Sequence, residues 1–201
     1  MFCRRLLPHW QPRGRPLFVT FRLFDRSGGT GFSLCTRRLQ PAGTPLSAGE
    51  RFLLRDRADD RASSGHKWLR DPAIAGIVRE TILGAELRGF CRLHAWVIMP
   101  NNVHLLLTPE IAASELMQEI KGRSARGANA ALGRTGQPFW QAESYDRWVR
   151  GAAEAARIRR YIERNPVAAG LVTRAEAWSW SSAYRGGGGP MRQAEACRHT
   201  G

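Results

Sequence analysis

The sequence predicts an α+β fold in which helices cover an antiparallel sheet. Residues 17–23 read as a first strand, and residues 91–99 and 102–108 read as two strands joined by a tight turn. Helical or extended patterns lie between and after them at residues 72–88, 114–132, 139–150 and 152–165. The resulting order β, α, β, β, α, β, α matches a ferredoxin-like split-βαβ layout with an added C-terminal helix.

The first strand, LFVTFRL, is rich in β-branched and aromatic residues. Residues 24–65 follow it and are rich in Gly, Ser, Arg and Asp, which predicts a flexible insertion because so long a loop is unusual in a compact domain. We therefore expect one domain over residues 1–184 that contains this insertion. The Gly-rich, basic residues 185–201 are expected to form a disordered tail.

The helices have recognisable ends. Asp71 followed by Pro72 is an N-cap with proline at the first helical position, and apolar residues continue at helical spacing to Gly89. The next helix is expected to begin with Ser114 as its N-cap and to end before Gly133. It would bury Leu116 and Ile120 and expose Lys121, Arg123 and Arg126. Residues 139–150 read as a strand or an extended segment, and the last helix as ending before Pro166.

The charge balance favours a polyanionic partner. The chain has 31 Lys and Arg against 17 Asp and Glu, a formal net charge of +14, and only Lys67 and Lys121 are lysines. Arginine grips phosphate in bidentate fashion and stacks on bases, which favours nucleic acid. Arginine enrichment in a high-GC genome is an alternative explanation.

The sequence gives little support to a disulfide-rich, zinc-binding, secreted or membrane protein. The cysteines are far apart, which fits neither a disulfide framework nor a zinc site and indicates a reducing cytosol. The basic N-terminus is interrupted by prolines before any apolar stretch develops. We expect no signal peptide, no membrane span and a cytoplasmic, nucleoid-associated protein.

The run HAWVIMPNNVHLLLTP at 94–109 carries the first candidate site. If the chain turns at Pro100-Asn101, then Asn102 and His104 point to one face of a strand while Val103 points into the core. Two such side chains on a rigid strand could hold a metal. The alternative is that asparagine serves the turn and that the histidine is an ordinary strand residue.

The last helix carries the second candidate site. Tyr161 and Asn165 stand four residues apart on one helix face, and Arg157 lies one turn before them. A nucleophile, a metal-capable amide and a phosphate-binding guanidinium would then share one surface. The alternative is that Tyr161 packs against the sheet and that Asn165 ends the helix before Pro166.

The blocks MPNNVHLLL, FWQAESYDRWVR and RYIERNPVAAGLV, followed by WSWSSAY, resemble the REP-associated tyrosine transposases. These are similar to insertion-sequence transposases of the HUH single-tyrosine superfamily. The opening LPHWQPRGRPLFVTFRL is also similar to the first strand of that family. The resemblance covers roughly residues 4–23 and 66–184, with the blocks in the expected order, and residues 24–65 fall outside it.

The resemblance implies a ferredoxin-like nuclease that holds Mg²⁺ or Mn²⁺ between two strand histidines and attacks single-stranded or hairpin DNA with a helical tyrosine. The matching positions are Asn102 and His104 for the metal and Tyr161 for the nucleophile, and Asn165 resembles the polar residue that completes the metal site. Asn102 departs from the family, which usually has the first histidine here. An amide oxygen ligates hard cations but is a weaker donor than imidazole for Mn²⁺, so a lower metal affinity is expected.

Two functions follow. The first is a metal-dependent endonuclease and strand transferase that cleaves and rejoins single-stranded hairpin DNA through a 5′-phosphotyrosine, with an activity that Asn102 weakens. The second is a catalytically inactive nucleic-acid-binding protein of the same fold, and a decayed reading frame is a third possibility. In either of the first two, arginines and one lysine would contact phosphates, and aromatic residues would be available for stacking. The residues in question are Lys121, Arg123, Arg126, Arg157, Arg159, Arg160 and Arg164 for phosphates and Trp140, Tyr145 and Trp148 for stacking. The alternative for each of these three aromatic residues is a place in the core. The sequence is compatible with a monomer or a homodimer.

Overall fold

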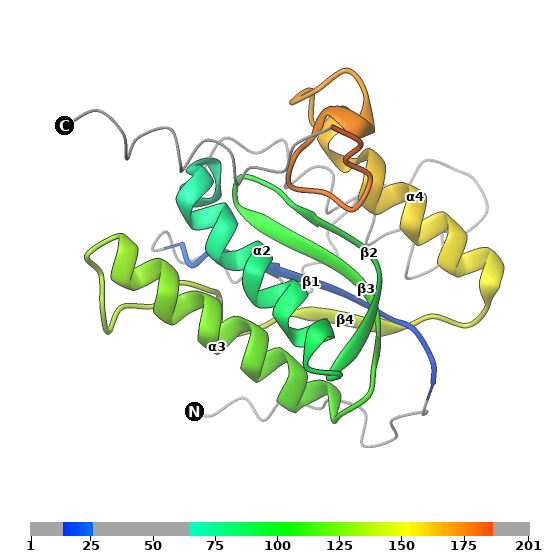
Figure 1. Cartoon of the computed structure of the whole chain (residues 1–201), viewed down its shortest axis with the longest axis horizontal. Helices are drawn as coiled ribbons and strands as arrows, with labels where there is room; N and C mark the ends of the chain where they lie inside the picture. The colour runs from blue at the N-terminus through cyan, green and yellow to red at the C-terminus, as the bar shows by residue number, and fades with distance from the viewer. Residues whose placement is uncertain (1–13, 26–64, 187–201) are drawn as a thin grey trace, which may run out of the picture.

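The computed structural model describes residues 14–25 and 65–186 of the chain (Figure 1). Its centre is a four-stranded antiparallel sheet with the strand order β2-β3-β1-β4. The strands are β1 (Leu17–Arg22), β2 (Cys91–Ile98), β3 (Asn102–Pro109) and β4 (Tyr145–Trp148). Because β3 lies between β1 and β2, the βαβ unit is split, which confirms the predicted ferredoxin-like α+β fold.

Three α-helices accompany the sheet: α2 (Pro72–Leu87), α3 (Ala113–Ala131) and α4 (Ala152–Ala168). Two short 3₁₀ helices, η1 (Trp68–Arg70) and η2 (Ala175–Ala177), complete the described elements. The predicted start of α2 is confirmed, because the Asp71 carboxylate accepts a hydrogen bond of 2.9 Å from the amide of Ala73. The predicted stop of α3 is confirmed as well, since Gly133 follows it with a φ of 65°.

Two predicted helix ends are wrong. The N-cap of α3 is Ala112, with no side-chain cap, so the helix starts before Ser114. Helix α4 continues through Pro166 to Ala168. Pro166 lies in the last turn of the helix. Its carbonyl accepts a hydrogen bond of 2.9 Å from Leu171, and the chain then leaves the helix through Gly170, with a φ of 70°.

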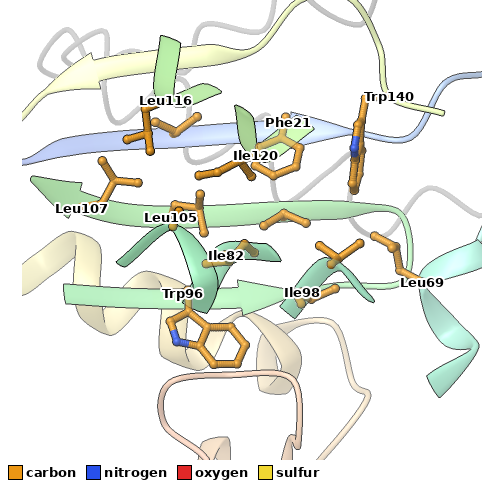
Figure 2. Close-up of a cluster of buried hydrophobic side chains, with 14 of the residues drawn as sticks. Phe21, Leu69, Ile82, Trp96, Ile98, Leu105, Leu107, Leu116, Ile120 and Trp140 are labelled. Carbon is orange, nitrogen blue, oxygen red and sulfur yellow. The ribbon is translucent and has the colours of Figure 1, made fainter. Parts of the chain in front are cut away.

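The larger core lies between the sheet and the layer formed by α2 and α3 (Figure 2). Leu105 and Leu107 of β3 meet Ile82 of α2 and Leu116 and Ile120 of α3 there. These apolar side chains are all buried, as the periodicity of each element predicts. A smaller core on the other face lies under α4.

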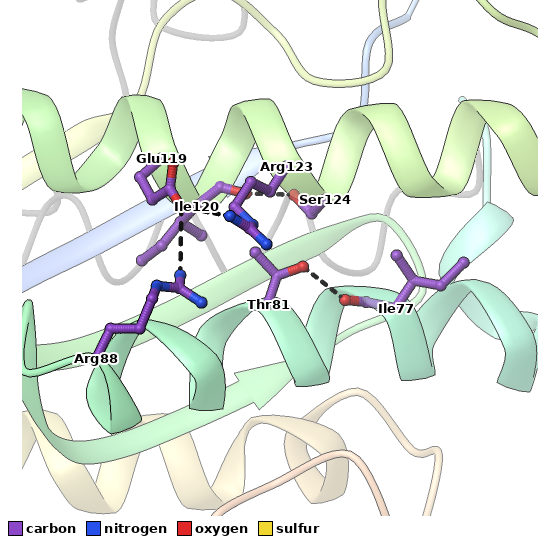
Figure 3. A network of polar contacts seen from close by, with 7 residues as sticks. All are labelled: Ile77, Thr81, Arg88, Glu119, Ile120, Arg123 and Ser124. Carbon is purple, nitrogen blue, oxygen red and sulfur yellow. Dashed lines mark hydrogen bonds and ion pairs between the residues drawn. The ribbon is translucent and has the colours of Figure 1, made fainter.

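The helices α2 and α3 pack closely against each other. A Cβ atom at Gly127 of α3 would lie only 2.8 Å from a methyl group of Ile77 on α2, so the glycine permits the close approach. Toward the other end, Glu119 of α3 accepts hydrogen bonds from Arg88 at 3.3 Å and from Arg123 at 3.2 Å (Figure 3). The pair with Arg88 connects the two helices, whereas the pair with Arg123 lies within α3. Partly exposed ion pairs of this kind contribute at most about 1 kcal/mol each.

The segment after α4 covers one edge of the sheet. Backbone hydrogen bonds join Ile98 to Trp180 at 2.8 Å and Ser182 to Trp96 at 2.9 Å, and Ser181 forms a bridge with Val97. The WSWSSAY block therefore protects the free edge of β2. The greater part of the predicted insertion and tail, residues 26–64 and 187–201, lies outside the described residues.

None of the described helices combines the length and the apolar character that crossing a lipid bilayer requires.

Candidate active site

Polar side chains lie together on the α4 face of the sheet, because successive side chains of β1 and of β3 point to opposite faces. Asn102 and His104 of β3 are both fully buried, with 0% exposure, while Val103 between them belongs to the core under α2 and α3. In the register of the sheet His104 lies opposite Thr20 of β1. The predicted alternation of residues 102 to 104 is confirmed, and it places a histidine in the interior of the protein.

Thr20 holds one nitrogen of this histidine. Its hydroxyl oxygen lies 2.8 Å from His104 Nδ1, and Thr20 is itself fully buried. The Nε2 atom points the other way, toward two carboxamides: Asn165 Nδ2 at 3.1 Å and Asn102 Nδ2 at 3.4 Å. With the amides in this orientation Nε2 accepts, so Nδ1 carries the proton and donates it to Thr20.

Helix α4 brings Asn165 and Tyr161 to the histidine. The ring centroids of Tyr161 and His104 are 5.7 Å apart, with an interplanar angle of 71°, and Tyr161 is 8% exposed. Ile158 and Ile162 on the same helix face are buried in the core under α4. The helix is therefore seated by its apolar residues, and Tyr161 and Asn165 follow at helical spacing.

The two candidate sites that the sequence predicted separately, Asn102 with His104 and Tyr161 with Asn165, lie together in the structure. The alternative, that Asn165 ends the helix, is wrong because α4 runs three residues further and the Asn165 amide reaches His104. The packing of Tyr161 against the sheet is compatible with both alternatives, since its ring contacts the core residue Phe18 as well as His104.

Two members of this cluster, Phe18 and Thr20, were not predicted from the sequence. Phe18 stacks on His104 with ring centroids 6.3 Å apart, and Thr20 forms the hydrogen bond just described. Both are in LFVTFRL, where alternation puts Phe18, Thr20 and Arg22 on one face. That pattern was the available signal, but only the sheet register identifies His104 as the partner of Thr20.

The predicted phosphate-binding residues form two groups on opposite sides of the molecule. Arg157, Arg160 and Arg164 are exposed on α4, the helix that carries Tyr161. Arg159 is also exposed, and its guanidinium donates to Glu163 at 2.9 Å.

The second group, Lys121, Arg123 and Arg126, lies on α3 and therefore beyond the sheet from His104. Lys121 differs from the expected exposed cation. It is half-buried, and its ammonium donates to the Gln141 carbonyl at 2.8 Å and to the Ser144 hydroxyl at 3.0 Å. Lys121 thus anchors the segment before β4, and Arg126 is an exposed residue of the same helix.

Trp140 is likewise unsuited to stacking on a base. It is buried, and its indole N–H donates to the Ser124 hydroxyl at 3.0 Å. Tyr145 and Trp148 are only partly buried.

His94 is a structural histidine that lies outside this cluster. Its Nε2 lies 2.8 Å from the Thr108 hydroxyl, near the other end of β3 from His104. Burial, assisted by the positive charge of Arg92, lowers the pKa of His94.

The donor set around His104 is neutral. Among the described residues no group of three or more His, Cys, Asp or Glu side chains could hold a metal. The imidazole and two carboxamides nevertheless fit a hard divalent cation, because turning each amide about its terminal bond presents oxygen instead of nitrogen toward Nε2. Three neutral protein ligands would leave coordination positions for water or phosphate oxygen.

The fold is similar to that of a solved transposase structure. The structure of the REP-associated tyrosine transposase bound to a REP hairpin matches with a TM-score of 0.57 and 18% identity, covering 90% of this chain and 82% of that chain. A protein from Deinococcus radiodurans R1 that is provisionally described as a transposase matches with a TM-score of 0.39 and 20% identity, covering 78% of this chain and 97% of that one. A comparison with curated proteins finds no match.

The family is shown by the sequence itself. The model of the family described as "Transposase IS200 like" matches residues 63–165, which is more than half of the chain. The match includes β3 with His104 and α4 as far as Asn165. The chain belongs to the IS200-like transposase family.

Proposed function

We propose that this transposase is a metal-dependent enzyme that cleaves and rejoins single-stranded hairpin DNA through a 5′-phosphotyrosine intermediate. The observation that carries the proposal is the convergence of Tyr161 and Asn165 of α4 with His104 of β3, whose Nε2 lies 3.1 Å from the Asn165 amide. A nucleophile and a polar ligand set meet there although their sequence positions are far apart.

The proposed reaction needs no external energy source, because each phosphoester bond that breaks is replaced by another. The Tyr161 phenol loses its proton to solvent and its oxygen attacks the phosphorus, forming a bond to the 5′ phosphate. The bond from phosphorus to the 3′ oxygen breaks, and that oxygen takes up a proton to become a free 3′-hydroxyl. Rejoining is the reverse: a 3′-hydroxyl attacks the phosphotyrosine and releases Tyr161.

His104, Asn102 and Asn165 would hold the metal, Mg²⁺ or Mn²⁺. When bound, the cation supplies polarisation of the scissile phosphate. Thr20 keeps the His104 ring oriented with Nε2 toward the two carboxamides. Because the three side chains carry no negative charge, we expect weak cation binding that the phosphate of bound DNA strengthens.

The basic face of α4 supports DNA as the substrate. Arg157, Arg160 and Arg164 are exposed beside Tyr161, and guanidinium groups bind phosphates whatever the base sequence. A protein of the same fold has been solved with a REP hairpin, which suggests hairpin DNA here as well. A DNA substrate would place the protein at the nucleoid in the cytoplasm. The protein would act there as a monomer or as a homodimer.

The direct test is the covalent adduct. Purified protein is incubated with a single-stranded DNA hairpin and Mg²⁺ or Mn²⁺, and the protein–DNA species is detected on a denaturing gel. We expect a metal-dependent adduct that Tyr161→Phe abolishes. The matched control is Tyr184→Phe, which removes the same hydroxyl from a partly buried tyrosine of the segment after α4 and should leave adduct formation intact.

Asn102 favours one alternative, a DNA-binding protein that has lost the chemistry. It stands where HUH enzymes usually have their first histidine, next to His104. Absence of adduct from the natural protein, together with a Tyr161-dependent adduct from Asn102→His, would show this alternative to be correct. Adduct formation by the natural protein would contradict it.

A further inference from the structure

Strand β1 directs a third side chain to the face that carries the proposed active site. Phe18 and Thr20 contact His104 on this face, and Phe21 and Leu23 belong to the core on the other face. Because side chains of a strand alternate, Arg22 follows Phe18 and Thr20 on the His104 face. It was not among the residues that the sequence singled out for DNA.

The register places Arg22 beside the candidate metal ligands. Arg22 lies directly opposite Asn102, in the row next to the pair formed by Thr20 and His104. The hydrogen bond of 2.8 Å between Thr20 and His104 shows that directly opposed side chains on this face do meet. Arg22 and Asn102 are therefore neighbours at the end of the strands where the site lies.

The backbone of Arg22 is held on both sides. Its carbonyl accepts a hydrogen bond of 2.9 Å from Gln141, and the amide of Leu23 donates to the Asn101 carbonyl at 2.9 Å. A residue fixed in this way presents its side chain from a rigid strand rather than from a mobile loop. Arg22 is half-buried, so part of the residue remains accessible to a ligand.

The positive charge of Arg22 suits it to binding a phosphate at this site. The cluster of Thr20, Asn102, His104 and Asn165 contains no carboxylate, so it offers little opposition to an anion. A guanidinium binds a phosphate through two parallel hydrogen bonds and keeps its charge at every physiological pH. The five-coordinate phosphorus that forms during attack carries more negative charge than the diester, and a fixed cation stabilises it.

We propose that Arg22 binds the scissile phosphate and is a catalytic residue of this transposase. The inference rests on the proposed function and assigns a different task from that of the α4 arginines, which would hold the flanking backbone. The charge of Arg22 also offsets the weaker cation binding that Asn102 imposes, because both positive groups would act on the same phosphate.

The test is a scan with neutral linkages. Proteins in the Tyr161→Phe background, which cannot react, are titrated with a hairpin oligonucleotide whose single-stranded flanks carry one methylphosphonate at a time. With Arg22 present, one linkage should weaken binding about tenfold when neutralised, the size expected for one charged hydrogen-bonded contact. The Arg22→Gln variant should bind unmodified DNA about tenfold more weakly and show no further loss at that linkage.

The controls separate a local contact from general charge. Arg22→Lys should recover part of the lost affinity and of the linkage-specific loss, because it keeps the charge without the fork. Arg70→Gln, at an exposed residue of η1 that has no assigned role in DNA binding, should leave the whole pattern unchanged. Thermal melting of each variant checks that the fold is intact.

The outcomes distinguish this proposal from the function on which it rests. The Arg22-dependent linkage should coincide with the linkage at which the Tyr161 protein forms its adduct. An adduct together with an unchanged scan for Arg22→Gln, or with an Arg22-dependent linkage elsewhere, would overturn the role of Arg22 and leave the enzyme. An Arg22-dependent linkage without any adduct would support phosphate binding by Arg22 and overturn the enzymatic function.

Discussion

The two faces of the sheet are built from the same strands but from different chemistry. On the face toward α2 and α3, Val103, Leu105 and Leu107 of β3 are packed among apolar side chains. On the face toward α4, Asn102 and His104 of the same strand are equally buried, at 0% exposure. A buried polar group costs free energy unless it finds a hydrogen-bond partner, and Thr20 and Asn165 supply partners here.

The difference separates stability from function along one strand. The apolar face contributes the greater part of the hydrophobic burial, and the polar face holds the groups that could act on DNA. Substitutions at consecutive residues of β3 should therefore have opposite effects: those on the apolar face should lower the stability of the fold, and those on the polar face should lower activity.

The largest effect is expected from Leu105→Ala on the apolar face. Removing a fully buried leucine leaves a cavity and should lower the free energy of unfolding by about 2 to 5 kcal/mol. Urea denaturation measures this loss, and adduct formation per folded molecule should stay within about twofold of the original, a small change on the free-energy scale. A selective loss of adduct in protein that is still folded would show that Leu105 is needed for activity as well as for stability.

His104→Gln should have the reverse effect, with a large loss of metal binding and adduct formation and a small loss of stability. It removes the imidazole from the proposed metal site, and we expect Mn²⁺ affinity to fall on the order of 100-fold, together with the adduct. The cost in unfolding free energy should be smaller, about 1 to 2 kcal/mol. Electron paramagnetic resonance of Mn²⁺ and urea denaturation measure the two quantities. Unaltered Mn²⁺ binding would remove His104 from the metal site.

Asn102→His should strengthen the polar face. An imidazole is a better ligand for Mn²⁺ than an amide oxygen, so affinity for Mn²⁺ should rise about tenfold or more, and that for Mg²⁺ should rise less. Isothermal titration with each metal, with Asn101→His in the adjacent turn as the control, checks the prediction. Equal gains from both substitutions would mean that an added histidine acts without forming the site.

Thr20→Val tests whether the hydrogen bond of Thr20 to Nδ1 orients the His104 ring. It keeps the shape of the residue but removes the oxygen 2.8 Å from Nδ1, and we expect Mn²⁺ affinity to fall about tenfold. Nitrogen-15 chemical shifts of the imidazole should show a change in the tautomer population, and Thr20→Ser should restore both properties. Unchanged nitrogen shifts in the valine variant would indicate that packing alone orients the ring.

The smallest effect concerns Cys91, on the apolar face. Burial, together with the negative charges of Glu86 and Glu110, raises the pKa of Cys91 to about 11. The folded state thus prefers the protonated thiol. Its contribution to stability is complete below the unfolded pKa near 9 and is lost as the pH rises toward 11. The unfolding free energy of the natural protein should fall more steeply between these pH values than that of Cys91→Ala, and equal slopes would contradict the prediction.

The local patterns of the sequence predicted most of the elements. Asp71 and Gly133 mark helix ends through their own backbone chemistry, and the alternation around Val103 assigned each residue of β3 to a face. Ser114 and Pro166 misled because capping and helix-breaking preferences are weak beside the packing of a whole helix. Lys121 misled because periodicity does not reveal that loop carbonyls lie within reach of its ammonium.

By itself the sequence determined the order of the elements, the basic character of the chain and the residue types of the site, because these depend on composition and short-range spacing. Only the tertiary structure decided that α4 packs on the face of the sheet opposite α2 and α3. That choice brings Asn165 to within hydrogen-bond distance of His104, 61 residues away, and separates both from Lys121. The physical reason is that an amphipathic pattern specifies which side of a helix is buried, whereas the surface that buries it depends on how the whole sheet is assembled.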